Sequence, residues 1–249
     1  MQAASFRRAA IFDSFPGLIA GESTRHGGVS RAPYYSLNLG KSTDDHPERV
    51  AENRRLFAAA AGFDLAAQAW SYQVHGDRIR LVTEPGGAEG YDAMISATPG
   101  IVLSVTVADC VPVLIYDPEN RAFAAVHAGW RGTAFELVSK TLAAMSEAFG
   151  TRGADCFAFI GTCIDECSFE VGEDVAQHFS SPFKRFDALT GKFFVDLKKA
   201  NAAQLMEAGL PEGQIGISPY CTVRNNADYF SHRADKGTTG RMLSVIGWI

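Results

Sequence analysis

Short apolar runs rich in β-branched residues recur through the central part of the chain, and polar turns separate them. Their length and composition predict strands rather than helices. The turn sequence Asp-Pro-Glu-Asn at 117–120 joins two of these runs, which are therefore expected to form a β-hairpin. The predicted strands in this region are residues 69–74, 78–83, 101–107, 111–116 and 122–126.

A different spacing of apolar residues predicts helices on either side of this region. Pro47 is expected to open a helix that runs to about residue 61, with Asp44 and Asp45 as its capping carboxylates. Residues 133–149 carry one apolar stripe and are followed by Gly150, which favours a long amphipathic helix. The remaining predicted elements are helices at 173–179 and 197–208 and strands at 157–160, 215–217 and 243–246.

Hairpins that lie next to helices, without strict strand–helix alternation, favour an α/β fold of the α+β type with mixed β-sheets covered by helices. The chain has 249 residues and contains no internal repeat, low-complexity segment or flexible linker. We therefore expect a single domain over residues 1–249.

Composition and charge narrow the functional classes. The chain is 47% hydrophobic and 20% charged, with a net charge of −5 and scattered Lys and Arg, so no nucleic-acid-binding surface is expected. Apolar runs are too short to span a bilayer and the amino terminus does not resemble a signal peptide, which predicts a cytoplasmic protein without membrane contact. Five cysteines, an odd number, favour a reducing compartment over a disulfide framework.

Three reactive side chains lie at or just beyond the ends of predicted strands. His75 occurs in Gln-Val-His-Gly, Cys110 in Ala-Asp-Cys-Val-Pro, and His127 in Val-His-Ala-Gly-Trp-Arg-Gly. Side chains at strand ends can converge on one cavity. A thiolate and two imidazoles would then form either a three-ligand metal site or a Cys–His nucleophilic pair.

These alternatives lead to different chemistry. Two His and one Cys without a fourth protein ligand leave an open coordination position, as in catalytic zinc sites, and the same ligands also accept copper. Zinc there could activate a water molecule near neutral pH. Without a metal, His127 could keep Cys110 as a thiolate for covalent catalysis. A third alternative is that Cys110 and His127 are simply buried core positions and that His75 belongs to a polar hairpin turn.

Several arginines in glycine-containing segments are candidates for binding an anionic group. Arg131 lies at the start of the long predicted helix, where its charge opposes the helix dipole and therefore indicates a ligand or a carboxylate partner. Arg233 and Arg241 lie around a glycine bend near the C-terminus and could bind phosphate or form a solvated loop. The loop from Arg25 to Asn38 could likewise bind a ligand or be a solvated loop. In the first case Asn38 could contact the polar edge of the ligand.

Together these motifs resemble the YfiH-type laccase-domain family, also called multicopper polyphenol oxidase domain proteins. The resemblance covers essentially the whole chain, and the combination of motifs is highly specific. It rests on the segments around His75, Cys110 and His127. It extends to the motifs at 24–30, 36–40, 53–54, 231–233 and 240–241.

The resemblance implies a fold, a catalytic centre and several activities. The fold would be a layered α-β-β-α sandwich similar to the catalytic domain of cytotoxic necrotizing factor toxins, and His75, Cys110 and His127 would bind zinc and carry out catalysis. The family is credited with phosphorolysis of adenosine, inosine, guanosine and methylthioadenosine, and with hydrolytic deamination of adenosine. Copper-dependent oxidation of phenols and, in some bacterial members, editing of peptidoglycan precursors are also credited to it.

A zinc-dependent purine nucleoside enzyme with nucleoside and phosphate as substrates is therefore the first expectation. In it, Asp109 would support a metal ligand or transfer a proton. A Cys–His hydrolase that acts on an amide is the runner-up. A multicopper laccase is disfavoured, because several coppers need many His ligands and the chain has six His. The expected substrate-binding residues are Arg25, Asn38, Arg131, Arg233 and Arg241.

One segment departs from the family pattern. The family commonly has Gly-Pro-Cys-Ile-Gly-Pro-Cys-Cys-Tyr-Glu-Val-Gly, whereas residues 161–172 read Gly-Thr-Cys-Ile-Asp-Glu-Cys-Ser-Phe-Glu-Val-Gly. Both prolines and the second of the adjacent cysteines are missing. Any role of this loop in substrate choice is therefore in doubt, whereas the three-residue centre is unaffected.

Overall fold

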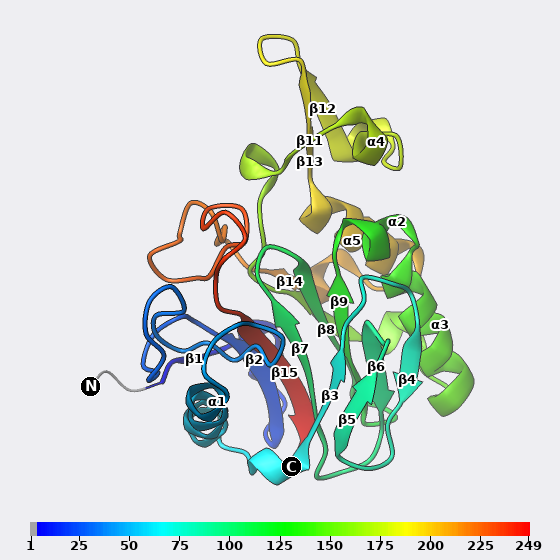
Figure 1. The fold of residues 1–249 in the computed structure, drawn as a ribbon. Coiled ribbons are helices and arrows are strands. Elements are labelled where there is room, and N and C mark those ends of the chain that lie inside the picture. The colour runs from blue at the N-terminus through cyan, green and yellow to red at the C-terminus, as the bar shows by residue number, and fades with distance from the viewer. Residues whose placement is uncertain (1–3) are drawn as a thin grey trace.

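Two six-stranded mixed sheets packed face to face form the centre of the molecule (Figure 1). The computed structural model describes residues 4–249 of the chain. In order across the first sheet, the strands are β1 (Phe6–Arg8), β2 (Leu18–Ser23), β15 (Met242–Trp248), β7 (Val102–Val107), β3 (Gln68–Tyr72) and β5 (Gly86–Glu89). Across the second sheet they are β14 (Ile215–Ile217), β10 (Phe157–Ile160), β8 (Val111–Asp117), β9 (Ala122–Ala128), β6 (Ala93–Ser96) and β4 (Ile79–Leu81).

The space between the two sheets is filled by alternate apolar side chains of their strands. Leu103 and Val105 of β7 belong to the same buried cluster as Leu114 of β8 and Phe123 of β9. Because successive side chains of a strand point to opposite faces, the intervening residues of each strand face the outer layers. Strands β8 and β9 are buried on both faces, which explains why they are nearly continuous hydrophobic runs rather than strictly alternating ones.

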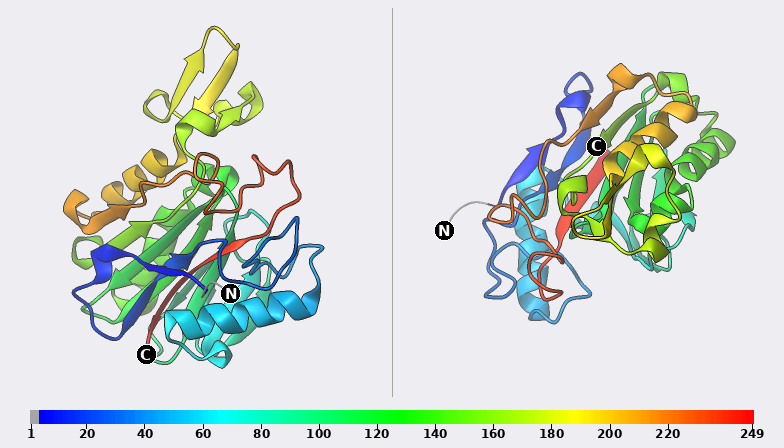
Figure 2. Two further views of the ribbon diagram at one scale, coloured as in Figure 1. Left: turned by 90° about the vertical axis from the view of Figure 1, so that its left-hand side faces the viewer. Right: turned by 90° about the horizontal axis from the view of Figure 1, so that it is seen from above.

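Helices cover both outer faces of the sheet pair. Helix α1 (Pro47–Ala61) packs Phe57 and its neighbours against the first sheet. Helices α3 (Leu137–Phe149) and α5 (Leu197–Glu207) pack against the second sheet. Figure 2 shows α1 and α3 on opposite sides of the sheets when the molecule is seen from above. The predicted mixed sheets covered by helices are thus confirmed. Within residues 4–249, no helix is long and apolar enough to cross a bilayer.

A small third sheet projects from this sandwich. Figure 1 shows it above the two large sheets, together with a short helix. Its strands are β11 (Glu170–Val171), β13 (Lys192–Val195) and β12 (Lys184–Asp187), and the helix is α4 (Glu173–Ala176), which is shorter than the predicted helix at 173–179.

The predicted hairpin is confirmed, because β8 and β9 pair antiparallel over their full length. The predicted helix at 133–149 is wrong in its first part. The chain forms the short helix α2 (Trp130–Ala134), passes through Glu136 at φ 57°, and only then begins α3. Side chains of α5 cause this break: Gln204 donates to the carbonyl oxygen of Thr133 at 2.8 Å, and Asn201 donates to the Thr133 hydroxyl at 3.0 Å.

The capping carboxylates predicted for α1 are also wrong. The N-cap residue is His46, whose side chain makes no capping hydrogen bond. Asp45 is buried and instead accepts hydrogen bonds from Ser30 at 2.5 Å and from Asn38 at 3.0 Å. The Asp45 carboxylate, which the sequence pattern predicted to cap the helix, therefore stabilises the preceding loop instead.

Candidate metal centre

Sheet topology brings the three strand-end residues together. Strands β3 and β7 are parallel neighbours, so their carboxyl ends meet at one sheet edge, where His75 and Cys110 follow them. Cys110 lies where the chain passes from β7 of the first sheet to β8 of the second. In the second sheet, Val111 pairs with Ala128 and Pro112 pairs with His127. The crossing between the two sheets therefore places Cys110 beside His127.

The side chains converge as a possible ligand group. One ligand atom each of His75, Cys110 and His127 lies within 4.8 Å of the others. The imidazole rings of the two histidines are 4.8 Å apart between centroids and nearly perpendicular, at 78°. Among residues 4–249, no other group of three His, Cys, Asp or Glu side chains comes close enough to hold a metal ion.

Asp92, which the sequence analysis missed, holds this group in place. Its Oδ1 atom lies 2.8 Å from Nδ1 of His127 and accepts a hydrogen bond from the backbone N–H of His75 at 2.9 Å. Its Oδ2 atom accepts from the backbone N–H groups of Val74 and Gly76 at 3.1 and 2.8 Å. A proton on Nδ1 of His127 leaves the Nε2 lone pair for a metal ion, as in carboxylate–histidine–metal arrangements.

The backbone is strained at two positions of the centre. His75 has φ 59° and Asp109, next to Cys110, has φ 85°. Side chains other than glycine rarely adopt this region, and such strain is concentrated at functional sites. For His75 the cost is offset by the bonds of Asp92 to the loop at 74–76.

Cys110 and His127 form a coupled pair when no metal is bound. Burial opposes ionisation of Cys110, but the nearby His127 and hydrogen bonds from both imidazoles lower the pKa of the thiol to about 6. Burial likewise opposes the charge on His127, yet Cys110 and Asp92 raise the pKa of this imidazole to about 9. The thiolate that a metal ion requires is therefore already available at neutral pH.

Gly129 provides the space that the centre needs. A Cβ atom at this position would lie 3.0 Å from Sγ of Cys110 and 3.3 Å from the His75 ring, whereas its φ of −65° suits any residue. We expect Gly129→Ala to displace the candidate ligands and to weaken binding of a divalent metal ion about tenfold in a competition titration with a chromophoric chelator. Gly132→Ala, whose Cβ would have no neighbour closer than 3.4 Å, is the matched control. Equal affinity in the two variants would contradict this account.

The centre opens into a cavity of about 360 Å³, a volume typical of small-molecule sites. Three aromatic side chains contribute to its wall, namely Trp70, Tyr72 and Phe169. Four basic side chains also line it. They are Lys41, Arg54, Arg233 and Arg241.

The predicted substrate-binding residues occupy different places. Arg233 and Arg241 line the cavity, and their guanidinium groups donate to backbone carbonyls, those of Arg233 to the loop at 161–172 and those of Arg241 to the two residues before it. Arg25, Asn38 and Arg131 are not among the residues that line it. Asn38 is fully buried and binds the surrounding loop, Arg25 donates to two backbone carbonyls, and Arg131 packs over Trp130.

Asp109 lies at the cavity wall, but its carboxylate faces the C-terminal loops. It accepts hydrogen bonds from the Thr222 hydroxyl at 2.5 Å and from the backbone N–H of Arg233 at 2.7 Å. These contacts hold Arg233 beside the metal centre. A role of Asp109 in proton transfer stays a prediction.

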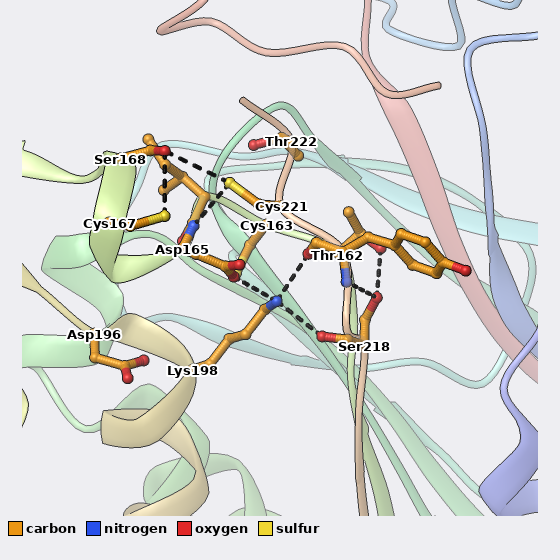
Figure 3. A network of polar contacts seen from close by, with 12 residues as sticks. Thr162, Cys163, Asp165, Cys167, Ser168, Asp196, Lys198, Ser218, Cys221 and Thr222 are labelled. Carbon is orange, nitrogen blue, oxygen red and sulfur yellow. Dashed lines mark hydrogen bonds and ion pairs between the residues drawn. The ribbon is translucent and has the colours of Figure 1, made fainter. Parts of the chain in front are cut away.

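The loop that departs from the family pattern forms another part of the wall through Ile164 and Phe169. Figure 3 shows how Lys198 of α5 holds this loop. The Lys198 ammonium lies 2.6 Å from Asp165 and donates to the carbonyl oxygens of Ser218 and Tyr220, both at 2.8 Å. An ion pair therefore fixes a loop in which the family's prolines are missing.

Comparison with known proteins gives a consistent result. The family described as multi-copper polyphenol oxidoreductase laccase matches residues 19–249. A purine nucleoside phosphorylase of Deinococcus radiodurans is 42% identical, covering 90% of this chain and 87% of the relative. The purine nucleoside phosphorylase YfiH of Escherichia coli K12 is 39% identical, covering 94% of both chains.

Solved structures resemble the whole molecule. The crystal structure of YlmD from Geobacillus stearothermophilus superposes with a TM-score of 0.93 at 34% identity, covering 100% of this chain and 97% of that one. YfiH of Bacillus licheniformis superposes with a TM-score of 0.90 at 32% identity, covering 98% and 99% of the two chains. This chain is therefore similar to both proteins in sequence as well as in fold.

Proposed function

Since this chain belongs to the multi-copper polyphenol oxidoreductase laccase family, and its relatives include proteins named purine nucleoside phosphorylases, we propose that it is a metal-dependent purine nucleoside phosphorylase. The observation that carries the proposal is the His75–Cys110–His127 group in a cavity lined by basic and aromatic side chains. A phosphorylase needs a site for an anion and a site for a flat purine base, and this cavity offers both kinds of side chain.

The donor set fits zinc. Two imidazole nitrogens and one thiolate are zinc ligands, and three protein ligands leave a position open for reaction chemistry. The lowered pKa of Cys110 makes its thiolate available to a cation, and the bond from Asp92 to Nδ1 of His127 leaves Nε2 as the ligand atom once the cation displaces its proton. The same donors also accept copper, so we propose zinc as the bound ion and copper as the alternative. When bound, the ion supplies a Lewis acid next to the substrate.

The protein residues have separate tasks in phosphorolysis. A phosphate oxygen forms a bond to C1′ of the ribose, the bond from C1′ to the purine nitrogen breaks, and the base leaves with the electron pair and gains a proton. Arg233 and Arg241 would bind the substrate by charge-assisted hydrogen bonds, at the phosphate or at the ribose. Trp70, Tyr72 and Phe169 supply flat surfaces on which a purine can stack.

We propose adenosine, inosine, guanosine and methylthioadenosine as substrates, with hydrolytic deamination of adenosine as a second activity of the same centre. In deamination, water adds to C6 of the purine and ammonia leaves. Phenol oxidation would be at most a side activity. A laccase needs several copper sites, whereas residues 4–249 contain one group of suitable ligands.

The proposal is tested by incubating inosine with the zinc-loaded protein, with and without phosphate, and analysing the products by chromatography. We expect hypoxanthine and ribose 1-phosphate to form in equal amounts, and only when phosphate is present. Release of hypoxanthine at the same rate without phosphate would indicate a hydrolase instead. No release of base from any of the four nucleosides would reject the proposal.

A Cys–His hydrolase remains the second candidate, because the pKa of Cys110 near 6 and that of His127 near 9 describe a thiolate–imidazolium pair. In that case metal-free protein would turn over an amide, and iodoacetamide would abolish this activity. An acyl group would also be trapped on Cys110 and detected by mass spectrometry. Turnover that requires the metal excludes this candidate.

A further inference from the structure

The wall of the cavity carries four basic side chains although the chain as a whole has a net charge of −5. Among residues 4–249, none of these four side chains forms an ion pair with a carboxylate. Arg233 donates to the backbone carbonyls of Ser168 and Glu170, and Arg241 donates to backbone carbonyls of its own loop. Lys41 and Arg54 are neighbours on this wall, and within residues 4–249 neither has a carboxylate partner.

Arg54 is buried, with a relative exposure of 4%. It donates to the carbonyl oxygen of Leu39 at 2.8 Å and to Oε1 of Gln68 at 2.6 Å, which uses two of the five N–H donors of a guanidinium group. The Nε2 atom of Gln68 is also buried and has no hydrogen-bond partner among the described residues. A buried cation without a counter-charge is costly, so this end of the cavity suits an anion.

Lys41 adds a second positive charge to the same wall. Its ammonium lies 3.5 Å from the centroid of the Trp70 ring and has no hydrogen-bond acceptor within residues 4–249. Loss of hydration and the nearby Arg54 charge lower the pKa of Lys41 to about 8. The two cations therefore repel each other, and an anion between them would relieve that repulsion.

We propose that Lys41 and Arg54 form an anion subsite that binds the phosphoryl group of a substrate. Arg54 offers a planar group with free donors, which matches phosphate oxygens, and Lys41 offers a point charge on a mobile stem. The shared ligand chemistry is a phosphate dianion. It comes either from the inorganic phosphate of phosphorolysis or from the 5′-phosphate of a purine nucleotide. The assignment to a substrate rests on the proposed function, whereas anion binding itself can be measured separately.

Binding of two probes to the full-length protein tests the subsite. Isothermal titration calorimetry gives the affinity for inorganic phosphate and for inosine 5′-monophosphate. In Lys41→Met, which removes the ammonium over Trp70 but keeps an unbranched side chain, we expect at least one of the two affinities to fall about 10- to 100-fold. A loss with inorganic phosphate identifies the co-substrate as the ligand, and a loss with the nucleotide alone identifies its 5′-phosphate.

Two further variants make the test specific. Lys199→Met, which removes an exposed lysine on α5 away from the cavity, is the matched control and should bind both probes as the unaltered protein does. Arg54→Lys keeps the charge but loses the planar donors, and should weaken the same probe as Lys41→Met. Unchanged affinities in Lys41→Met would overturn the subsite even if inosine is cleaved. Loss of phosphate binding without any inosine cleavage would reject the proposed function and retain the subsite.

Discussion

Replacing Cys110 with alanine is expected to remove zinc from the protein and to reduce kcat/KM for inosine phosphorolysis by about 10³-fold or more. The thiolate is one of the three proposed ligands, and its pKa of about 6 makes it the anionic member at neutral pH. A catalytic metal contributes several kcal/mol of transition-state stabilisation, and about 4 kcal/mol corresponds to that factor. Metal content by elemental analysis and initial rates of hypoxanthine release check the prediction.

Cys167→Ala is the control for this variant. Cys167 is an exposed free thiol that does not line the cavity, so its loss should change neither metal content nor rate. Full activity of Cys110→Ala would contradict the assignment of the centre. Loss of activity with zinc still bound at full occupancy would instead indicate that Cys110 acts as a nucleophile.

Replacing Asp92 with asparagine is expected to lower zinc affinity about 10- to 100-fold, although Asp92 itself does not belong to the ligand group. The carboxylate accepts four hydrogen bonds, from His127 and from three backbone N–H groups of the loop that carries His75. An asparagine side chain has one oxygen, and its amide group would face two of these donors. Each buried donor left without an acceptor also costs roughly 1–3 kcal/mol of unfolding free energy.

Asp77→Asn gives the comparison, because Asp77 follows the same loop but is exposed and pairs with Lys140 at 2.5 Å. Zinc affinity from a competition titration should fall in Asp92→Asn and stay unchanged in Asp77→Asn. Activity at saturating zinc should recover partly in Asp92→Asn, since the three ligands remain. The idea that Asp92 positions His127 fails if the two variants bind zinc equally well.

The clustering of the three candidate ligands could be predicted from the sequence, whereas the residues that support them could not. His75, Cys110 and His127 each follow or end an apolar strand, which is a local signal. Asp92 directly precedes β6, and only the pairing of β6 with β9 brings it to His127. Lys41 lies in a polar loop without any local signal. Its place at the cavity depends on Trp70 from another part of the chain.

The fold shows the same distinction. The strands at the middle of each sheet are continuous apolar runs, so periodicity and composition predict them. Edge and short strands such as β5, which reads Gly-Gly-Ala-Glu, have no such pattern and exist because a neighbouring strand offers its backbone groups. The break at Glu136 depends on side chains of α5 that lie far along the chain. Local sequence patterns therefore predict the central strands and the candidate ligands. The edge strands and the helix break depend on tertiary contacts, which the local sequence does not show.

The most direct measurement is a zinc titration of metal-free protein in which formation of ribose 1-phosphate from inosine and phosphate is followed by phosphorus NMR. If one centre held by His75, Cys110 and His127 drives phosphorolysis, the rate should rise linearly with zinc and reach a plateau at one ion per chain. Full activity before any zinc is added, or a plateau only at several ions per chain, would contradict the account.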